Sequence, residues 1–289
     1  MTTQTNRIDQ MFEQRPGQWP ALVCFITAGD PGLAHTVPVM HALVRGGASM
    51  IELGMPFSDP MADGPVIQGA SERALARGAD LKYVLRCVAE FRENDQTTPI
   101  VLMGYLNPLE RYGFDVFCQQ AHDAGIDGLL IVDLPPEEAA CITDHSAALD
   151  LKQIFLVAPT TSADRLAAIS AVASGFIYYV ALKGITGAAN LDAGDVARHT
   201  ESIREKSALP VAVGFGIKSR DDIQSLRDAA AAVVVGTALV GELAEGCRAK
   251  SDNTTDACDV ESAITIAENF AKRLSHAEAD SAAAAKGAI

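Results

Sequence analysis

The sequence predicts a single (β/α)8 barrel, the TIM-barrel fold, and two observations lead to that prediction. Short apolar runs recur along the 289 residues, and they alternate with longer stretches whose apolar residues have helical spacing. Parallel strands need such crossover helices, and eight strand and helix pairs fit this barrel better than a doubly wound open sheet. The first turn reads AGDPG, which is not the GxGxxG of a dinucleotide-binding fold.

The apolar runs are the expected strands, at residues 22–27, 50–53, 100–103, 128–132, 153–157, 176–180, 211–213 and 232–235. Helices are expected between them, at residues 33–45, 81–92, 114–124, 136–148, 163–172, 196–206 and 220–229. An amphipathic N-terminal helix at residues 7–14 is expected to cap the bottom of the barrel. An extra C-terminal helix at residues 260–274 is expected after a polar insert at 249–257.

These elements assign residues 1–275 to one barrel domain with a catalytic site. Residues 276–289 have little apolar surface to bury, so a disordered C-terminal tail is expected there.

Composition argues against several classes of protein. With 48% hydrophobic residues the chain is expected to fold, yet its apolar runs fall far short of the roughly 20 residues of a membrane span. The N-terminus has no apolar core that could serve as a secretion signal, so a cytoplasmic location is expected. A formal charge of −14 opposes binding to the phosphate backbone of nucleic acid.

Cysteine and histidine spacing predicts no metal site. The six cysteines include no CxxC pair and are expected to be reduced, and the six histidines are equally scattered.

Polar residues near the carboxyl ends of the strands are the candidates for chemistry in such a barrel. Glu52 alternates with Ile51 and Leu53 in the second strand and is therefore expected to point into the barrel mouth. A buried glutamate could be half of a structural ion pair, but no basic residue lies nearby in sequence, which favours a functional role. Asp63 follows in the loop PFSDPMADGP, where an aspartate could equally be a turn residue.

Residues 51–68, IELGMPFSDPMADGPVIQ, strongly resemble the signature of the tryptophan synthase α subunit family. The resemblance continues through FITAGDPG, MGYLNP, DGLLIVDLPPEE, KGITGA and GFGI, in order along almost the whole barrel. It implies an enzyme of tryptophan biosynthesis, a carbon–carbon lyase that cleaves indole-3-glycerol phosphate into indole and glyceraldehyde 3-phosphate. Only the region after about residue 246 is uninformative.

By this resemblance Glu52 and Asp63 are the catalytic pair, and Tyr178 is a supporting residue. The retro-aldol step first requires protonation of indole C3, which places positive charge on the ring nitrogen that Asp63 would stabilise. A hydroxyl proton of the glycerol chain then leaves, so Glu52 is expected to act first as an acid and then as a base. Neither step needs a metal or an organic cofactor in this chain.

The resemblance also implies a substrate site with an apolar and a polar end. An apolar slot for indole would be lined by Phe25, Met103, Leu130, Val132, Leu156, Thr186, Phe215 and Val234, although barrel interiors commonly hold such residues. The phosphate is expected beside Gly187, Gly216, Gly236 and Thr237, because glycines and a helix N-terminus after the last strands bind phosphate in many barrels. Thr237 stands where the family usually has serine.

A β subunit that carries pyridoxal phosphate is the implied partner, in an α2β2 assembly. The family's partner-facing loops match here through Pro56, Asp59, Asn107, Pro108 and Pro135.

Three alternative functions differ in what they require of the sequence. A free-standing lyase that releases indole remains an alternative, because sequence separates it poorly from a partnered subunit. A non-catalytic activating subunit is disfavoured, because the carboxylates and phosphate glycines are intact. A sugar-phosphate epimerase would need metal-binding histidines at strand ends, where this sequence has none.

Overall fold

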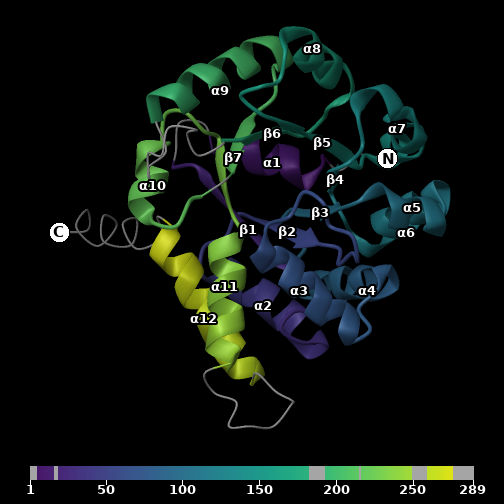
Figure 1. Ribbon diagram of the computed structural model, residues 1–289, viewed down its shortest axis with the longest axis vertical. Helices are drawn as coiled ribbons and strands as arrows, with labels where there is room; N and C mark the ends of the chain where they lie inside the picture. Colours follow the sequence, from purple (N-terminus) through teal and green to yellow (C-terminus); the bar gives the residue numbers. More distant parts are fainter. Residues whose placement is uncertain (1–4, 16–18, 182–192, 215, 249–258, 276–289) are drawn as a thin grey trace.

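The computed structural model is a closed barrel of eight parallel strands, in which each strand pairs with the next in sequence and β8 pairs with β1 (Figure 1). It describes residues 5–15, 19–181, 193–214, 216–248 and 259–275. The predicted fold class is therefore confirmed. The tail at 276–289 and the insert at 249–257 lie outside the described residues.

Each expected apolar run overlaps one strand. The strands are β1 (Ala21–Thr27), β2 (Met50–Gly54), β3 (Ile100–Gly104), β4 (Gly128–Ile131), β5 (Lys152–Val157), β6 (Ile177–Val180), β7 (Val211–Gly214) and β8 (Ala232–Val235). The helices are α1 (Arg7–Glu13), α2 (Thr36–Arg45), α3 (Pro65–Ala76), α4 (Leu81–Arg92), α5 (Leu106–Tyr112), α6 (Phe114–Ala124), α7 (Ala140–Ser146), α8 (Ala163–Val172), α9 (Ala193–Ser207), α10 (Arg220–Ser225), α11 (Thr237–Arg248) and α12 (Val260–Leu274).

The helices α3, α5 and α11 are missing from the prediction. The helices α5 and α11 begin two residues after a strand end, and α3 follows the long loop after β2. In all three places glycine and proline are typical of loops. Pro65 begins α3 and Pro108 lies in the first turn of α5, and both are compatible with a helix there because first-turn N–H groups have no intrahelical partner. The expected helix at 136–148 is broken into two 3-10 turns around α7, and α10 ends at Ser225 instead of residue 229.

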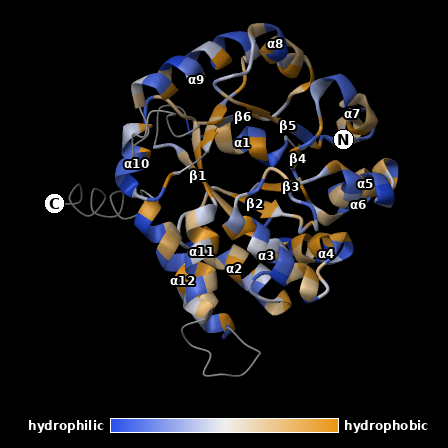
Figure 2. Cartoon of the chain, viewed as in Figure 1, coloured by the Kyte–Doolittle hydropathy of each residue, from blue (hydrophilic) through white to orange (hydrophobic). Residues whose placement is uncertain are grey.

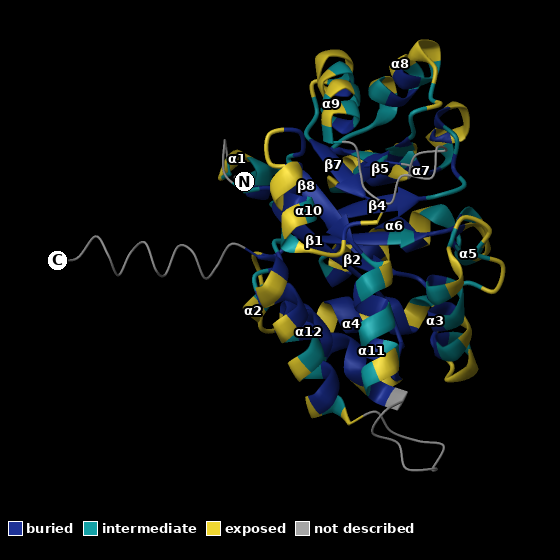
Figure 3. Ribbon diagram, turned by 60° about the vertical axis from the view of Figure 1, so that its left-hand side comes forward, coloured by how far each residue is buried: buried dark blue, intermediate teal, exposed yellow. Residues whose placement is uncertain are grey.

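The barrel interior is closed at its N-terminal end by α1. Ile8 and Met11 of α1 belong to the same buried cluster as the inward-facing residues of the strands, such as Val23, Val101 and Leu130. The alternate residues of each strand face outward and pack on amphipathic helices, whose mixed faces are visible in Figure 2. Figure 3 shows the strands buried and the exposed residues gathered on the outer faces of helices such as α9 and α12. The expected N-terminal cap is thus present.

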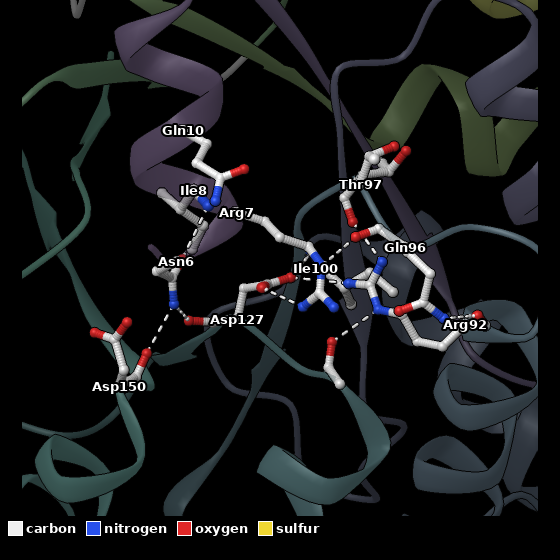
Figure 4. Close-up of polar contacts among 12 residues, drawn as sticks. Asn6, Arg7, Ile8, Gln10, Arg92, Gln96, Thr97, Ile100, Asp127 and Asp150 are labelled. Atoms are coloured by element: carbon white, nitrogen blue, oxygen red, sulfur yellow. Dashed lines mark hydrogen bonds and ion pairs between the residues drawn. The ribbon is translucent and has the colours of Figure 1, made fainter. Parts of the chain in front are cut away.

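An ionic cluster around Asp127 ties α1 to the barrel (Figure 4). The Arg7 guanidinium donates to Asp127 Oδ1 at 2.9 Å, while Arg92 and the Ile100 amide donate to Oδ2 at 2.9 and 2.8 Å. The Asn6 side chain donates to the Asp127 carbonyl at 3.0 Å. Burial lowers the pKa of Arg92 to about 10 and raises that of Asp127, so each charge needs the other.

The cysteines require one correction. Cys24, Cys87, Cys118 and Cys141 are free thiols, as expected. Cys247 on α11 is disulfide-bonded, so the expectation that all six are reduced is wrong for this residue. The expectation rested on the lack of a CxxC pair, and a disulfide does not require that spacing.

Within the described ranges, no group of three or more His, Cys, Asp or Glu side chains could hold a metal ion. No helix in these ranges is long and apolar enough to cross a membrane.

We expect Asp127→Ala to lower the free energy of unfolding by about 3–5 kcal/mol, because it leaves the buried Arg92 charge without its partner. Urea unfolding followed by circular dichroism measures the change. The matched control is Asp144→Ala on the exposed face of α7, which should stay within about 0.5 kcal/mol of the parent. A loss below about 1 kcal/mol for Asp127→Ala would show that Arg92 finds other partners.

Candidate active site

A cavity of about 370 Å³ opens at the carboxyl ends of the strands. Among the residues that the sequence analysis names, it is lined by Phe25, Glu52, Asp63, Met103, Tyr178, Gly216, Val234, Gly236 and Thr237. Leu130 lies in the interior cluster and is 1% exposed, and Leu156 packs against the same cluster. Thr186, Gly187 and Phe215 are outside the described residues. The size suits a small ligand with an aromatic ring.

Glu52 contributes a buried carboxyl group to this cavity. Its neighbours Ile51 and Leu53 face outward into the helix layer, so the alternation of β2 turns Glu52 inward. The residue is 3% exposed, and its Oε1 atom has no hydrogen-bond partner among the described residues. Burial raises the pKa of Glu52 to about 8, with a smaller contribution from the negative charge of Asp63. At neutral pH the group is therefore mostly protonated and available as an acid.

Asp63 reaches the cavity from the loop between β2 and α3. Burial raises its pKa, although a hydrogen bond from Tyr105 opposes that shift. The Tyr105 hydroxyl also accepts from the Ala62 amide at 3.0 Å, and the Gln68 side chain donates to the Asp63 carbonyl at 2.7 Å. The loop is thus fixed on both sides of its carboxylate.

Tyr105 is a residue of the site that the sequence analysis does not single out. It lies inside the MGYLNP motif, directly after β3, and it is 3% exposed. An aromatic hydroxyl directly after a strand end is the signal that could have identified it.

Tyr178 lies on β6, across the barrel from Glu52 on β2. Burial and then the charge of Glu52 raise its pKa well above the usual value for tyrosine, so the phenol stays protonated. Its ring occupies the space where a side chain at Gly214 would be, because a Cβ there would overlap the phenol group. The glycine that ends β7 therefore makes room for this tyrosine.

Aromatic and thioether side chains form one wall of the cavity. Phe25 is the register partner of Glu52 across β1 and β2, and its ring lies over Gly54, where a Cβ would come within 2.7 Å of it. Met103 packs against the small cluster that contains Phe25 and Ile67. Such a wall can hold a planar aromatic ring, because aromatic faces stack and methionine adapts its shape.

Another part of the cavity, where β7 and β8 end and Gly236 lies next to Phe25, offers backbone groups and a helix end. Gly216 has a φ of +77°, a conformation that favours glycine, and Gly236 precedes Thr237, the exposed first residue of α11. The N–H groups of the first turn of a helix attract anions. Lys218 also lines the cavity and adds a positive charge that the sequence analysis did not include.

The expected interface residues lie at the same end of the barrel. Asp59 and Asn107 are exposed, and Pro56, Pro108 and Pro135 are partly buried, all in segments that follow β2, β3 and β4. The ring of Phe57 lies 5.3 Å from that of Tyr105, so this surface is continuous with the Asp63 loop.

The family model for the tryptophan synthase alpha chain matches residues 12–272. The chain belongs to this family. A curated relative, the tryptophan synthase alpha chain of Alkalilimnicola ehrlichii, is 56% identical over 240 residues, which are 83% of this chain and 88% of the relative.

Solved structures of the family have the same fold. The crystal structure of tryptophan synthase subunit alpha from Legionella pneumophila is 41% identical, with a TM-score of 0.83, over 94% of this chain and 97% of that one. A chain from the tryptophan synthase α2β2 complex of Pyrococcus furiosus, described as a study of mutual activation, is 36% identical with a TM-score of 0.74, over 88% and 97%.

The raised pKa of Glu52 predicts that the residue costs stability at alkaline pH. The unfolded chain releases this proton above about pH 4.5, whereas the folded protein keeps it up to about pH 8, so folding is weakened as pH rises between these values. We expect Glu52→Gln to be more resistant to urea than the parent at pH 8, by roughly 1 kcal/mol or more, and to differ less at pH 5.

The control for this measurement is Glu90→Gln on the exposed face of α4, which should show no such gain between pH 5 and 8. Equal gains at both pH values would mean that the amide improves packing and that protonation is not the cause.

Proposed function

We propose that the cavity binds indole-3-glycerol phosphate and that the chain cleaves it into indole and glyceraldehyde 3-phosphate, as a carbon–carbon lyase. The observation that carries this proposal is a pair of carboxyl groups with different environments in one cavity. Glu52 is 3% exposed and has a pKa of about 8, whereas Asp63 lies in a loop and receives a hydrogen bond from Tyr105. Membership of the tryptophan synthase alpha chain family supports the same reaction.

The difference between the carboxyls suits the proposed proton transfers. Protonated Glu52 gives its proton to indole C3, and Asp63 hydrogen-bonds the ring N–H as positive charge develops there. The Glu52 carboxylate then takes the proton of the hydroxyl on the carbon attached to C3. That carbon becomes the aldehyde, its bond to C3 breaks, and the electron pair restores the aromatic ring. A base with a pKa near 8 is well matched to this second transfer.

Binding of the substrate phosphate is assigned to the part of the cavity where β7 and β8 end. Gly216, Gly236 and Thr237 line it, and Gly187 is included by family resemblance. The formal charge of −14 disfavours an anion at long range, so the local N–H groups of α11 and the charge of Lys218 must provide the attraction. Tyr178 supports the site from β6, across the barrel from Glu52.

The proposed mechanism uses only proton transfers, so it requires no metal or organic cofactor in this chain. Pyridoxal phosphate is assigned to a β subunit that would use the indole. The α2β2 complex named for the Pyrococcus furiosus relative supports such a partner, with Pro56, Asp59, Asn107, Pro108 and Pro135 as the contact surface. Direct transfer of indole to that partner distinguishes this function from a free-standing lyase.

We expect the pure chain to release indole from indole-3-glycerol phosphate, and Glu52→Gln and Asp63→Asn each to lower turnover by at least roughly a hundredfold. In the parent, kcat/KM should decline as pH rises through about 8, because Glu52 must be protonated to act as the acid. Release of indole is followed by chromatography, with Glu90→Gln as the active control. Near-parental turnover in either carboxyl variant removes that residue from the mechanism.

Adding the β subunit from the same source should raise the lyase rate. Asp59→Ala and Asn107→Ala should reduce that rise more than they reduce the basal rate, because both residues are exposed beside the Asp63 loop. The matched control is Asp123→Ala. Asp123 lies near the end of α6, just before β4, and therefore toward the opposite end of the barrel. A chain that is fully active alone and indifferent to the β subunit is a free-standing lyase.

A further inference from the structure

An ion pair outside the cavity connects the first turn of the barrel to α3. Asp30, in the turn after β1, accepts from Arg73 Nε at 2.7 Å through Oδ1 and from Arg73 Nη2 at 2.9 Å through Oδ2. Two parallel bonds of this kind fix both the distance and the orientation of the guanidinium. The Asp30 side chain is 3% exposed and that of Arg73 is 28% exposed, so solvent screens this pair only in part.

The turn that carries Asp30 is itself anchored. The Gly29 amide donates to the Thr36 hydroxyl at 2.9 Å, and that hydroxyl lies 2.7 Å from the Tyr83 hydroxyl, which donates to the Leu33 carbonyl at 2.7 Å. Thr36 and Tyr83 are buried on α2 and α4. Asp30 is therefore a fixed point to which α3 is attached.

The helix on the other side of the pair carries the Asp63 loop. α3 begins at Pro65, two residues after Asp63, and the Gln68 side chain in its first two turns holds the Asp63 carbonyl at 2.7 Å. A shift or rotation of α3 must therefore move the backbone of Asp63. Arg73 lies roughly 12 Å along the helix axis from Pro65, at a rise of about 1.5 Å per residue. Neither Arg73 nor Asp30 lines the cavity.

The buried face of α3 needs a directional contact. Beyond Ile67 it consists of Ala70, Ser71 and Ala74, whose small side chains have few atoms in contact with their neighbours. Among the polar side-chain contacts that the structure describes for α3, the Asp30–Arg73 pair is the one that reaches the barrel from beyond the Asp63 loop. Apolar packing buries the helix, and this ion pair adds a contact of fixed direction.

We propose that Asp30 and Arg73 are positioning residues for the catalysis proposed above: their bidentate ion pair sets the register of α3 and thereby places the Asp63 carboxylate over the substrate ring. The inference rests on the proposed role of Asp63. It assigns a functional consequence to two residues that touch neither the substrate nor the reacting atoms.

Kinetics of four variants test this role. Asp30→Ala and Arg73→Ala should each lower kcat roughly tenfold and change KM less than about threefold, because a misplaced carboxylate loses contacts made in the transition state. The double variant should lose no more than the worse single variant, since both changes break one interaction. Arg73→Lys should recover part of kcat, because it keeps the charge and one hydrogen bond.

A second readout does not depend on the reaction. Hydrogen exchange at the amides of Ala62 and Asp63 should be faster in Arg73→Ala than in the parent, because these amides bond to Tyr105 and to the Pro60 carbonyl within the loop that α3 holds. Arg77→Ala, one turn further along and exposed, is the matched control and should leave kcat within about twofold and the exchange unchanged.

The outcomes separate the two proposals. If the parent releases no indole, the proposed function fails, and the exchange rates still decide whether the pair holds the loop. If the parent is active but folded Arg73→Ala keeps its kcat, or exchange at Ala62 and Asp63 is unchanged, the positioning role is overturned. Should Arg73→Ala not fold, Arg73→Lys and Asp30→Asn carry the same measurements, and parental kcat and exchange in both would overturn it.

Discussion

The burial of a carboxyl group that has no ion-pair partner among the described residues is the constraint on which the site depends. Glu52 lies in β2 with an unpaired Oε1 atom, and its pKa of about 8 follows from the loss of water around it. Such an environment requires a barrel without an open path for solvent from below. The cluster formed by α1 and the inward-facing residues, with Ile8 and Met11 in it, provides that seal. The acid at one end of the barrel thus depends on the packing of a short helix at the other.

The two ends of the barrel treat buried charge in opposite ways. At the N-terminal end, both carboxylate oxygens of Asp127 accept hydrogen bonds, and the charge is balanced by Arg7 and Arg92. At the C-terminal end, no described residue donates to Glu52 Oε1, and Tyr105 donates to the Asp63 carboxylate. A carboxylate whose oxygens are all hydrogen-bonded stabilises the fold, whereas a carboxyl group with a free oxygen remains available to a substrate. Barrels commonly divide stability and chemistry between their two ends in this way.

Much of this arrangement could be predicted from the sequence, because it depends on local patterns. Alternation in β2 predicted that Glu52 points inward, and the recurring apolar runs predicted each strand to within a few residues. Asp63 required the family resemblance, since an aspartate in a proline-rich loop carries no signal of its own. Tyr105, Lys218 and the Asp30–Arg73 pair were missed because they act through neighbours that are distant in sequence. The helix α3 was missed because it begins at Pro65, and a proline that follows a loop rich in glycine and proline is easily taken for part of that loop.

The contact between Tyr178 and Gly214 makes two positions on adjacent strands a single unit. A side chain at 214 and a tyrosine ring at 178 cannot occupy the same space, so position 214 cannot take a side chain while the tyrosine is kept. A larger residue at 214 would have to be accompanied by a smaller one at 178, which would exchange a phenol across the barrel from Glu52 for empty volume in the cavity. The width of the cavity and the polarity around Glu52 are therefore linked. A change in the size of the ring system that the cavity accepts would also change the surroundings of this proton donor.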